Sequence, residues 1–158
     1  MEVNGVEASE FLLNGYVAGE LKVSVALVAG EAQLLKDDVK RFAPWIETVA
    51  LKQSLSRLSA KSPSMKRIET ELRSAVRKAA VSFKKGKTGL LSIKKPVRIE
   101  LTFLQSQFAD IAELLPAVKR VDGLKVEYSA NSMVEAYKTF ELLVLAASGM
   151  TALLEGLR

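Results

Sequence analysis

The sequence predicts an α/β fold going over to α+β: parallel-sheet βα units followed by a βαββα-like C-terminal part. Two patterns carry this prediction. Val23–Ala29 is a continuous apolar run ended by Gly30, which is typical of a strand covered on both faces in a parallel sheet. Val97–Phe103 instead alternates apolar and polar residues, which is typical of a half-buried strand in a sheet with one wet face.

The elements expected before residue 52 alternate between strand and helix. They are a strand end with an Asn-Gly turn at 2–6, a helix from Ser9 to about Leu21, a strand at 23–29, a helix at 31–42 and a strand at 46–51. Ser9 is the expected N-cap of the first helix, with Glu10 in its first turn. Pro44 is expected to end the second helix.

A polar loop is predicted next, over Lys52–Lys61. Ser62 followed by Pro63 predicts a helix start, with the serine as N-cap and the proline at the first helical position. This helix is expected to run to about Lys85 and to be stopped by Gly86. Five lysines and two glycines between residues 84 and 96 then predict a domain boundary, which gives domains 1–85 and 86–158.

The predicted C-terminal domain, an α+β subdomain, begins with the 97–103 strand. A short helix carrying Phe108 on its apolar face and ended by Pro116 follows, and then a hairpin that turns at Asp122-Gly123. A last helix, capped by Ser129 or Asn131, is expected to extend to about Ala147.

Composition excludes several functions for these 158 residues. There is no cysteine and no histidine, so the chain alone builds neither a disulfide or thiolate site nor a Ser-His-Asp triad or histidine-rich zinc site. No Walker A loop, G-x-G-x-x-G or G-x-S-x-G motif is present. The charge-free apolar stretches 23–30 and 142–154 are shorter than the roughly 20 residues of a membrane span, so no span is expected.

Three features are candidates for function. Glu10 and Asn14 lie four residues apart, so they share a helix face and could point into a site, although Glu10 could equally compensate the helix dipole. Lys52 and Arg57 flank the hydroxyl groups of the predicted polar loop, after a strand end of the kind that binds ligands in α/β proteins. Lys61 to Arg98 holds twelve cationic residues against two acidic ones, which fits a nucleic-acid surface or a solvated helix face.

Four stretches of the chain form a further pattern: Val3–Gly19, Val28–Gly30, Val49–Arg57 with Ser62-Pro63, and Ser132–Tyr137. Together they resemble the DppA-type D-aminopeptidases, the zinc-dependent M55 peptidase family. Their order and spacing agree over nearly the whole chain, but only with the C-terminal portion of the family. The family's Asp-x-Glu-Gly metal motif and its histidines precede this portion and have no counterpart in these residues.

The resemblance implies that domain 1–85 is the C-terminal part of the metal-site domain. It implies one metal ligand, Glu10 of a Glu-x-x-x-Asn pattern, and substrate-binding roles for Asn14, Lys52 and Arg57. No catalytic residue lies in this chain. The implied activity is the zinc-dependent release of N-terminal D-amino acids from short peptides by a cytoplasmic, ring-like homo-oligomer.

One carboxylate does not hold a zinc cluster, so we expect this chain to be inactive alone. The chain would then be a truncated product, a proteolytic fragment or one half of a split enzyme. In the split case a separate N-terminal half would supply the other ligands of the site. The alternatives are a non-enzymatic oligomeric scaffold and, less favoured, a basic module that binds nucleic acid.

Overall fold

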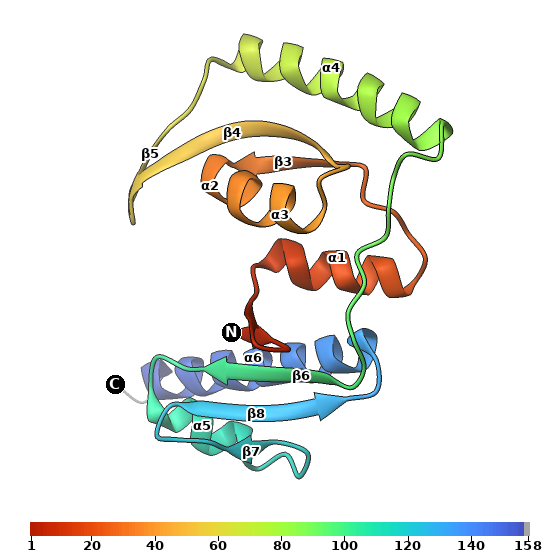
Figure 1. The fold of residues 1–158 in the computed structure, drawn as a ribbon. Helices are drawn as coiled ribbons and strands as arrows, with labels where there is room; N and C mark the ends of the chain where they lie inside the picture. Colours follow the sequence, from red (N-terminus) through yellow and green to blue (C-terminus); the bar gives the residue numbers. More distant parts are fainter. Residues whose placement is uncertain (157–158) are drawn as a thin grey trace. The chain divides into compact units, whose positions relative to one another are not determined.

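The computed structural model describes residues 1–156 and has a mixed α/β fold, which confirms the predicted class (Figure 1). The chain divides into two compact units. One unit is Ser9–Ser92, and the other combines Met1–Ala8 with Ile93–Arg158. Each unit contains its own sheet, so the two are described separately.

The Ser9–Ser92 unit is a three-layer arrangement around a small sheet of order β3-β4-β5. Its strands are β3 (Leu27–Glu31), β4 (Glu47–Ser56) and β5 (Ser59–Lys61), and its helices are α1 (Glu10–Glu20), α2 (Ala32–Leu34), η1 (Leu35–Val39), α3 (Lys40–Phe42) and α4 (Met65–Lys84). β3 and β4 are parallel, and β5 returns antiparallel to β4. Figure 1 shows α4 on one side of this sheet and the helical segment α2–η1–α3 on the other.

The first helix, α1, confirms its prediction from cap to end. The Ser9 hydroxyl accepts a hydrogen bond from the Leu12 N–H at 3.3 Å, which satisfies one of the free donors of the first turn. At the other end the Val23 N–H bonds to the Ala18 carbonyl at 2.8 Å, and Lys22 adopts a positive φ of 63°. This is a Schellman closure with lysine at the position that glycine usually occupies.

That closure explains why the next strand is shorter than predicted. The apolar run from Val23 was expected to be strand from its first residue, but β3 begins only at Leu27. The backbone of Val23 is used to close α1, so the chain must turn before it can extend. The segment 31–42 is helical as predicted, with a π-helical stretch at η1 that places Leu35 and Val39 in the core.

The predicted polar loop at Lys52–Lys61 is wrong. β4 continues to Ser56, and the chain turns at Arg57 and Leu58 into β5, which forms a hairpin. The side chains from Lys52 to Lys61 are exposed on both faces, so no apolar alternation marks the strands in the sequence. Backbone pairing holds the hairpin, together with a 2.7 Å contact between the hydroxyl groups of Ser56 and Ser59.

The predicted start of α4 is also wrong by two residues. The N-cap is Ser64, whose hydroxyl accepts from the Arg67 N–H at 3.4 Å, while Ser62 and Pro63 precede the helix. The predicted end is confirmed: α4 ends at Lys84, and Gly86 adopts a positive φ of 65°.

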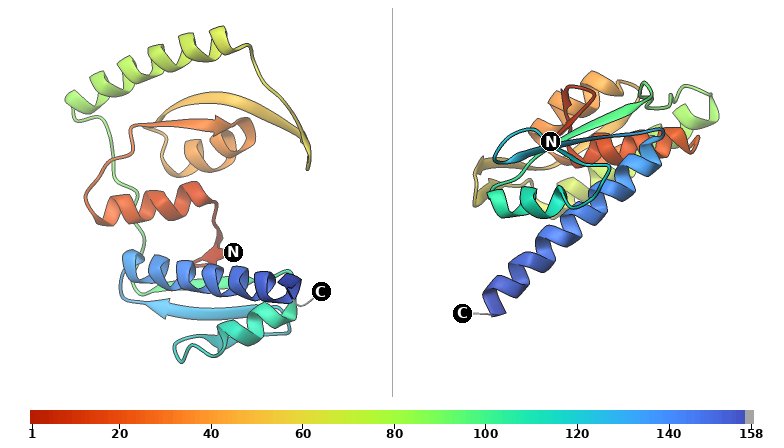
Figure 2. Two further views of the ribbon diagram at one scale, coloured as in Figure 1. Left: turned by 180° about the vertical axis from the view of Figure 1, so that it is seen from behind. Right: turned by 90° about the horizontal axis from the view of Figure 1, so that it is seen from below.

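The second unit is a fully antiparallel sheet of order β2-β1-β6-β8-β7. Its elements are β1 (Glu2–Val3), β2 (Val6–Glu7), β6 (Val97–Thr102), α5 (Ser106–Ala112), β7 (Lys119–Arg120), β8 (Lys125–Ala130) and α6 (Met133–Gly156). The Asn-Gly turn between β1 and β2 and the hairpin around Asp122-Gly123 confirm their predictions. α6 packs on this sheet through Met133, Ala136 and Leu143 (Figure 2).

The structural division differs from the predicted boundary at residues 85 and 86 in two respects. Met1–Ala8 belongs with the C-terminal sheet, because β1 pairs with β6 and Val3 lies opposite Ile99 in its core. The side chain of Asn4 fixes this pairing: its oxygen accepts from the Arg98 N–H at 2.7 Å. The later boundary at 92 arises because Leu91 packs on α1, where Gly15 and Gly19 leave room for it.

The last helix corrects two further expectations. Its first turn is capped by Ser132, whose hydroxyl accepts from the Glu135 N–H at 3.0 Å, and not by Ser129 or Asn131. It also extends to Gly156, past the predicted end at Ala147. No membrane span was expected from the sequence. Within the described residues, however, α6 is a helix that is long enough and apolar enough, by length and composition alone, to cross a membrane. A single helix of this kind is weak support for a span, and three of its side chains, Met133, Ala136 and Leu143, are buried.

Candidate functional site

Glu10 and Asn14 lie one turn apart on the exposed face of α1. The opposite face buries Leu12, Leu13 and Tyr16, which fixes the rotation of the helix. Both polar side chains are therefore solvent-facing, and neither makes a hydrogen bond or ion pair within residues 1–156. This confirms the predicted shared face, and leaves the Glu10 carboxylate at the positive end of a helix with its oxygens free.

The residues present do not fit a zinc ion on their own. In the described part of the chain, no three His, Cys, Asp or Glu side chains are placed to hold a metal together. Structural zinc sites use four protein ligands and catalytic sites three, whereas Glu10 is a single carboxylate. A zinc site that includes Glu10 therefore requires ligands that this chain does not contain.

Lys52 and Arg57 are not brought together as a single polar loop. Lys52 lies in the middle of β4 and lines a groove of about 260 Å³ with Lys61, Ser62 and Arg67. Arg57 lies at the hairpin turn and does not line this groove. No hydrogen bond or ion pair within residues 1–156 joins either cation to Glu10 or Asn14.

Glu31 is a polar residue of this region that the sequence reasoning missed. One carboxylate oxygen accepts from the Ser54 N–H at 3.0 Å, and the other accepts from Gln33 at 2.6 Å and Leu34 at 3.1 Å. These donors, the Ser54 N–H first, hold the pKa of Glu31 below its usual range. Glu31 thus caps α2 and ties the end of β3 to β4. An acidic residue directly after Gly30 and before a helix was the signal for this role.

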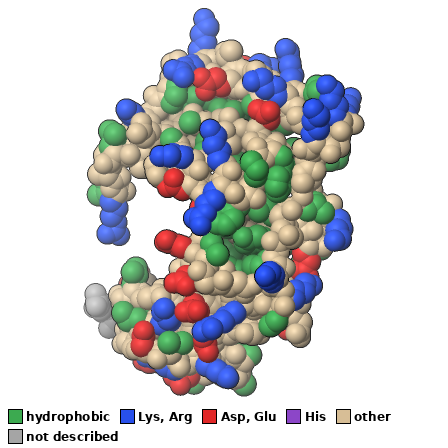
Figure 3. All heavy atoms as spheres, in the orientation of Figure 1, with side chains coloured by type: hydrophobic (Ala, Val, Ile, Leu, Met, Phe, Trp, Pro, Cys, Tyr) green, Lys and Arg blue, Asp and Glu red, His purple; other side chains and the backbone are tan. Residues whose placement is uncertain are grey.

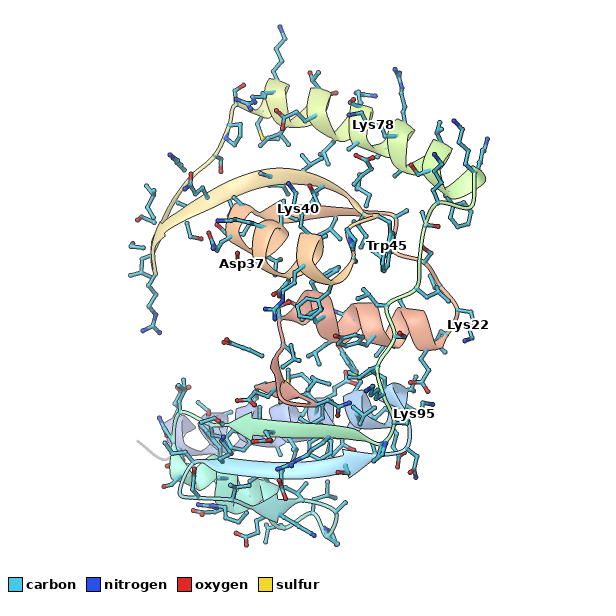
Figure 4. The ribbon with its side chains drawn as sticks, in the orientation of Figure 1. Lys22, Asp37, Lys40, Trp45, Lys78 and Lys95 are labelled. Atoms are coloured by element: carbon cyan, nitrogen blue, oxygen red, sulfur yellow. The ribbon has the colours of Figure 1, made fainter. Side chains whose placement is uncertain are left out.

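The basic segment from Lys61 to Arg98 is dispersed over α4 and the chain that follows it. Arg67 pairs with Glu71 and Arg73 with Glu69, each at 2.7 Å along the helix. Figure 3 shows Lys and Arg side chains scattered over this region on the visible face, and Figure 4 shows Lys78 on the outer side of α4. This distribution favours a solvated helix face over a nucleic-acid groove.

The segment after α4 packs instead on an aromatic side chain. Figure 4 shows Trp45, which follows α3, beside this segment. A Cβ added to Gly89 would lie 3.1 Å from the Trp45 ring, and the Ser24 hydroxyl donates to the Gly89 carbonyl at 2.8 Å. These contacts, with Leu91 against α1, make residues 87–92 part of the unit that carries Glu10.

The fold agrees with a known class of metallopeptidase. Residues 1–142 match the sequence model of peptidase family M55, described as D-aminopeptidase. The chain belongs to this family.

A D-aminopeptidase of Bacillus subtilis (strain 168) is 30% identical over 149 residues, which cover 94% of this chain and 53% of the relative. The solved structure of the Zn-dependent D-aminopeptidase DppA from Bacillus subtilis, described as a self-compartmentalizing protease, superposes with a TM-score of 0.79 at 28% identity. That match covers 93% of this chain and 53% of DppA. The chain thus spans about half the length of these relatives, which fits the predicted correspondence to the family's C-terminal portion.

Proposed function

We propose that this chain is the C-terminal part of a zinc-dependent peptidase of the D-aminopeptidase type, which releases N-terminal D-amino acids from short peptides. The observation that carries the proposal is the family match over residues 1–142, in which Glu10 stands free on the first turn of α1. Zinc, when bound, would polarise the scissile carbonyl and activate water. The chain contributes Glu10 to the metal site, and the remaining ligands come from polypeptide outside these 158 residues.

The other three predicted site residues have supporting roles in this proposal. Asn14 presents an amide one turn from Glu10, which can both donate to and accept from a peptide backbone. Lys52 supplies a positive charge at the groove formed with Lys61 and Arg67, which suits a substrate carboxylate. Arg57, at the exposed hairpin turn, reaches substrate only if the hairpin borders the completed site.

We also propose that the assembled peptidase is a cytoplasmic homo-oligomer. The support for the oligomer is the relative DppA, described as self-compartmentalizing. The cytoplasmic assignment rests on the resemblance to the family alone.

The test is reconstitution. The chain is purified alone and after co-expression with the part of the Bacillus subtilis D-aminopeptidase that has no counterpart in it. Zinc content and hydrolysis of a D-alanyl dipeptide are measured for both. We expect zinc and activity only in the co-expressed complex, because the chain alone lacks a ligand set.

Two variants make the test specific to the proposed ligand. Glu10→Gln removes the ligand charge and should lower zinc content and hydrolysis at least about 10-fold, because loss of even a group that only orients a metal ligand costs about 10–100-fold. Glu141→Gln is the control, since Glu141 is also an exposed helical glutamate without a partner in residues 1–156, and it should retain both. Full activity of the chain alone, or equal effects of the two variants, would contradict the proposal.

A non-enzymatic oligomeric scaffold is the second candidate. The observation that favours it is the second half of α6, where Val144, Leu145 and Leu153 are exposed apolar side chains. This candidate requires a stable homo-oligomer without metal or second polypeptide. Native mass spectrometry of the purified chain decides it: a monomer excludes the scaffold.

A further inference from the structure

The strand β3 occupies an unusual place in its sheet. Its only neighbour within residues 1–156 is β4, so it forms one edge of the sheet β3-β4-β5. The other sheet edges are short and each carries a charged residue: β5 ends in Lys61, β2 contains Glu7, and β7 is Lys119–Arg120. Such features protect edges from further pairing. β3 has five residues and is apolar as far as Gly30. The charge at its end, Glu31, accepts hydrogen bonds from the backbone of Gln33, Leu34 and Ser54, so it is directed at α2 and β4 and does not protect the free edge.

Both faces of β3 are already covered. It contacts α4 on one face and η1 on the other, and all five of its residues are half-buried rather than exposed. Figure 1 shows the two helical layers on opposite sides of this sheet. Strands that are apolar throughout and covered on both faces are typical of the interior of a parallel sheet, where a strand lies on each side.

The backbone register identifies which groups are free. The Glu47 N–H donates to the Ala26 carbonyl at 3.1 Å, and in a parallel ladder the residues that face one neighbour recur at every second position. Val28 and Gly30 therefore bond to β4. Leu27 and Ala29 direct their N–H and C=O groups to the free edge.

We propose that the free edge of β3 is a docking site for an extended, apolar strand of the polypeptide that supplies the missing zinc ligands. This inference rests on the proposed function. The occupant follows from two observations: the relatives have about as much chain again as this one, and residues 1–156 lack a metal ligand set. Strand addition would use backbone hydrogen bonds for affinity and the apolar character of β3 for selectivity.

Residue-resolved hydrogen exchange of the full chain tests this directly. In the chain alone, the amides of Leu27 and Ala29 should exchange about 100-fold faster than those of Val28 and Gly30, because only the latter pair is bonded to β4. In the complex with the co-expressed part of the Bacillus subtilis relative, Leu27 and Ala29 should slow by about the same factor.

A matched pair of variants isolates the outward hydrogen bond. Ala29→Pro removes an N–H that faces the free edge and leaves the ladder to β4 intact, so it should abolish co-purification of the complex. Ala29→Val keeps that N–H and should preserve the complex. The unfolding midpoint of each variant, followed by fluorescence of Trp45 in the same unit, shows whether the chain is folded. If Ala29→Pro does not fold, the exchange measurement decides alone.

The outcomes separate this inference from the proposed function. An active, zinc-containing complex in which Leu27 and Ala29 still exchange rapidly would overturn the docking site and leave the function standing. Slowed exchange at these two amides in a complex without zinc or activity would support the docking site and refute the function. If protection of Leu27 and Ala29 grows with the concentration of the chain alone, the edge pairs with a second copy, and the inference is overturned. Failure of the two polypeptides to co-purify would also overturn it.

Discussion

Replacement of Gly19 by alanine tests the packing that holds residues 87–92 against α1. A Cβ built at Gly19 would lie 1.7 Å from the carbonyl oxygen of Leu91 and 2.8 Å from its carbonyl carbon. These are backbone atoms, which move only if the whole segment moves. The segment is in turn held by Trp45 and by the hydrogen bond from Ser24, so its displacement disturbs the unit further.

Two opposing effects set the change in the free energy of unfolding that Gly19→Ala should cause. Alanine is favoured over glycine inside a helix by about 1 kcal/mol. Insertion of a methyl group into filled space costs about 1–3 kcal/mol, and contact with backbone places Gly19 at the upper end. The net expectation is a loss of about 2 kcal/mol in the free energy of unfolding. For a chain of this size that corresponds to a decrease in melting temperature of about 4–8 °C.

The assay is chemical denaturation followed by fluorescence of Trp45, the only tryptophan, which lies in the same unit as Gly19. The matched control is Gly149→Ala in α6, where no atom lies within 4 Å of the added Cβ. Helix propensity acts alone there, so far-UV circular dichroism should show a gain of about 1 kcal/mol or less. A Gly19→Ala protein as stable as the parent would refute the claim that Leu91 packs on α1.

Four further predictions follow from single contacts. Lys22→Gly should raise the stability of the Ser9–Ser92 unit by about 1 kcal/mol in denaturant titration, because glycine adopts the positive φ of the α1 closure without strain. Tyr128→Phe should lower stability by about 1 kcal/mol in the same assay, since the buried hydroxyl donates to the Ala136 carbonyl at 2.8 Å. Burial raises the pKa of Tyr128, so its phenol should stay protonated in a spectrophotometric titration to pH 11, roughly a unit above the usual value. The N–H groups of residues 124 and 125 lower the folded-state pKa of Asp122, so its contribution to stability is present above the unfolded pKa and is lost as the pH falls through the folded pKa. Asp122→Asn should therefore remove this pH dependence of the free energy of unfolding below about pH 4, measured by denaturation at each pH.

Sequence patterns were sufficient where a local signal and the packing agree. Helix α1 is marked by the Ser9 cap, and β6 by strict alternation, and both lie where they were predicted. The hairpin at Lys52–Lys61 carries no such signal, because both of its faces are exposed and backbone pairing alone holds it. The cap of α4 was misplaced because Ser62 and Ser64 offer the same local chemistry, and only the path of the chain selects Ser64.

The candidate site was likewise predictable from the sequence only where a local signal was sufficient. The spacing of Glu10 and Asn14 is a local property of a helix, so their shared exposed face was predictable from the sequence. The separation of Lys52 from Arg57 was not, since it depends on β4 continuing beyond its buried half. Glu31 was missed because its role depends on the Ser54 N–H, which lies on the neighbouring strand.

The sequence by itself determined the fold class, the family and the absence of histidine and cysteine as zinc ligands. A chain without histidine or cysteine can offer zinc only carboxylates, and the structure brings no three of these together within residues 1–156. Only the tertiary structure decided which unit each segment joins and which strand edge stays free. Those properties depend on pairing between residues far apart in the chain, as between Val3 and Ile99, and a pattern within one segment does not specify its partner.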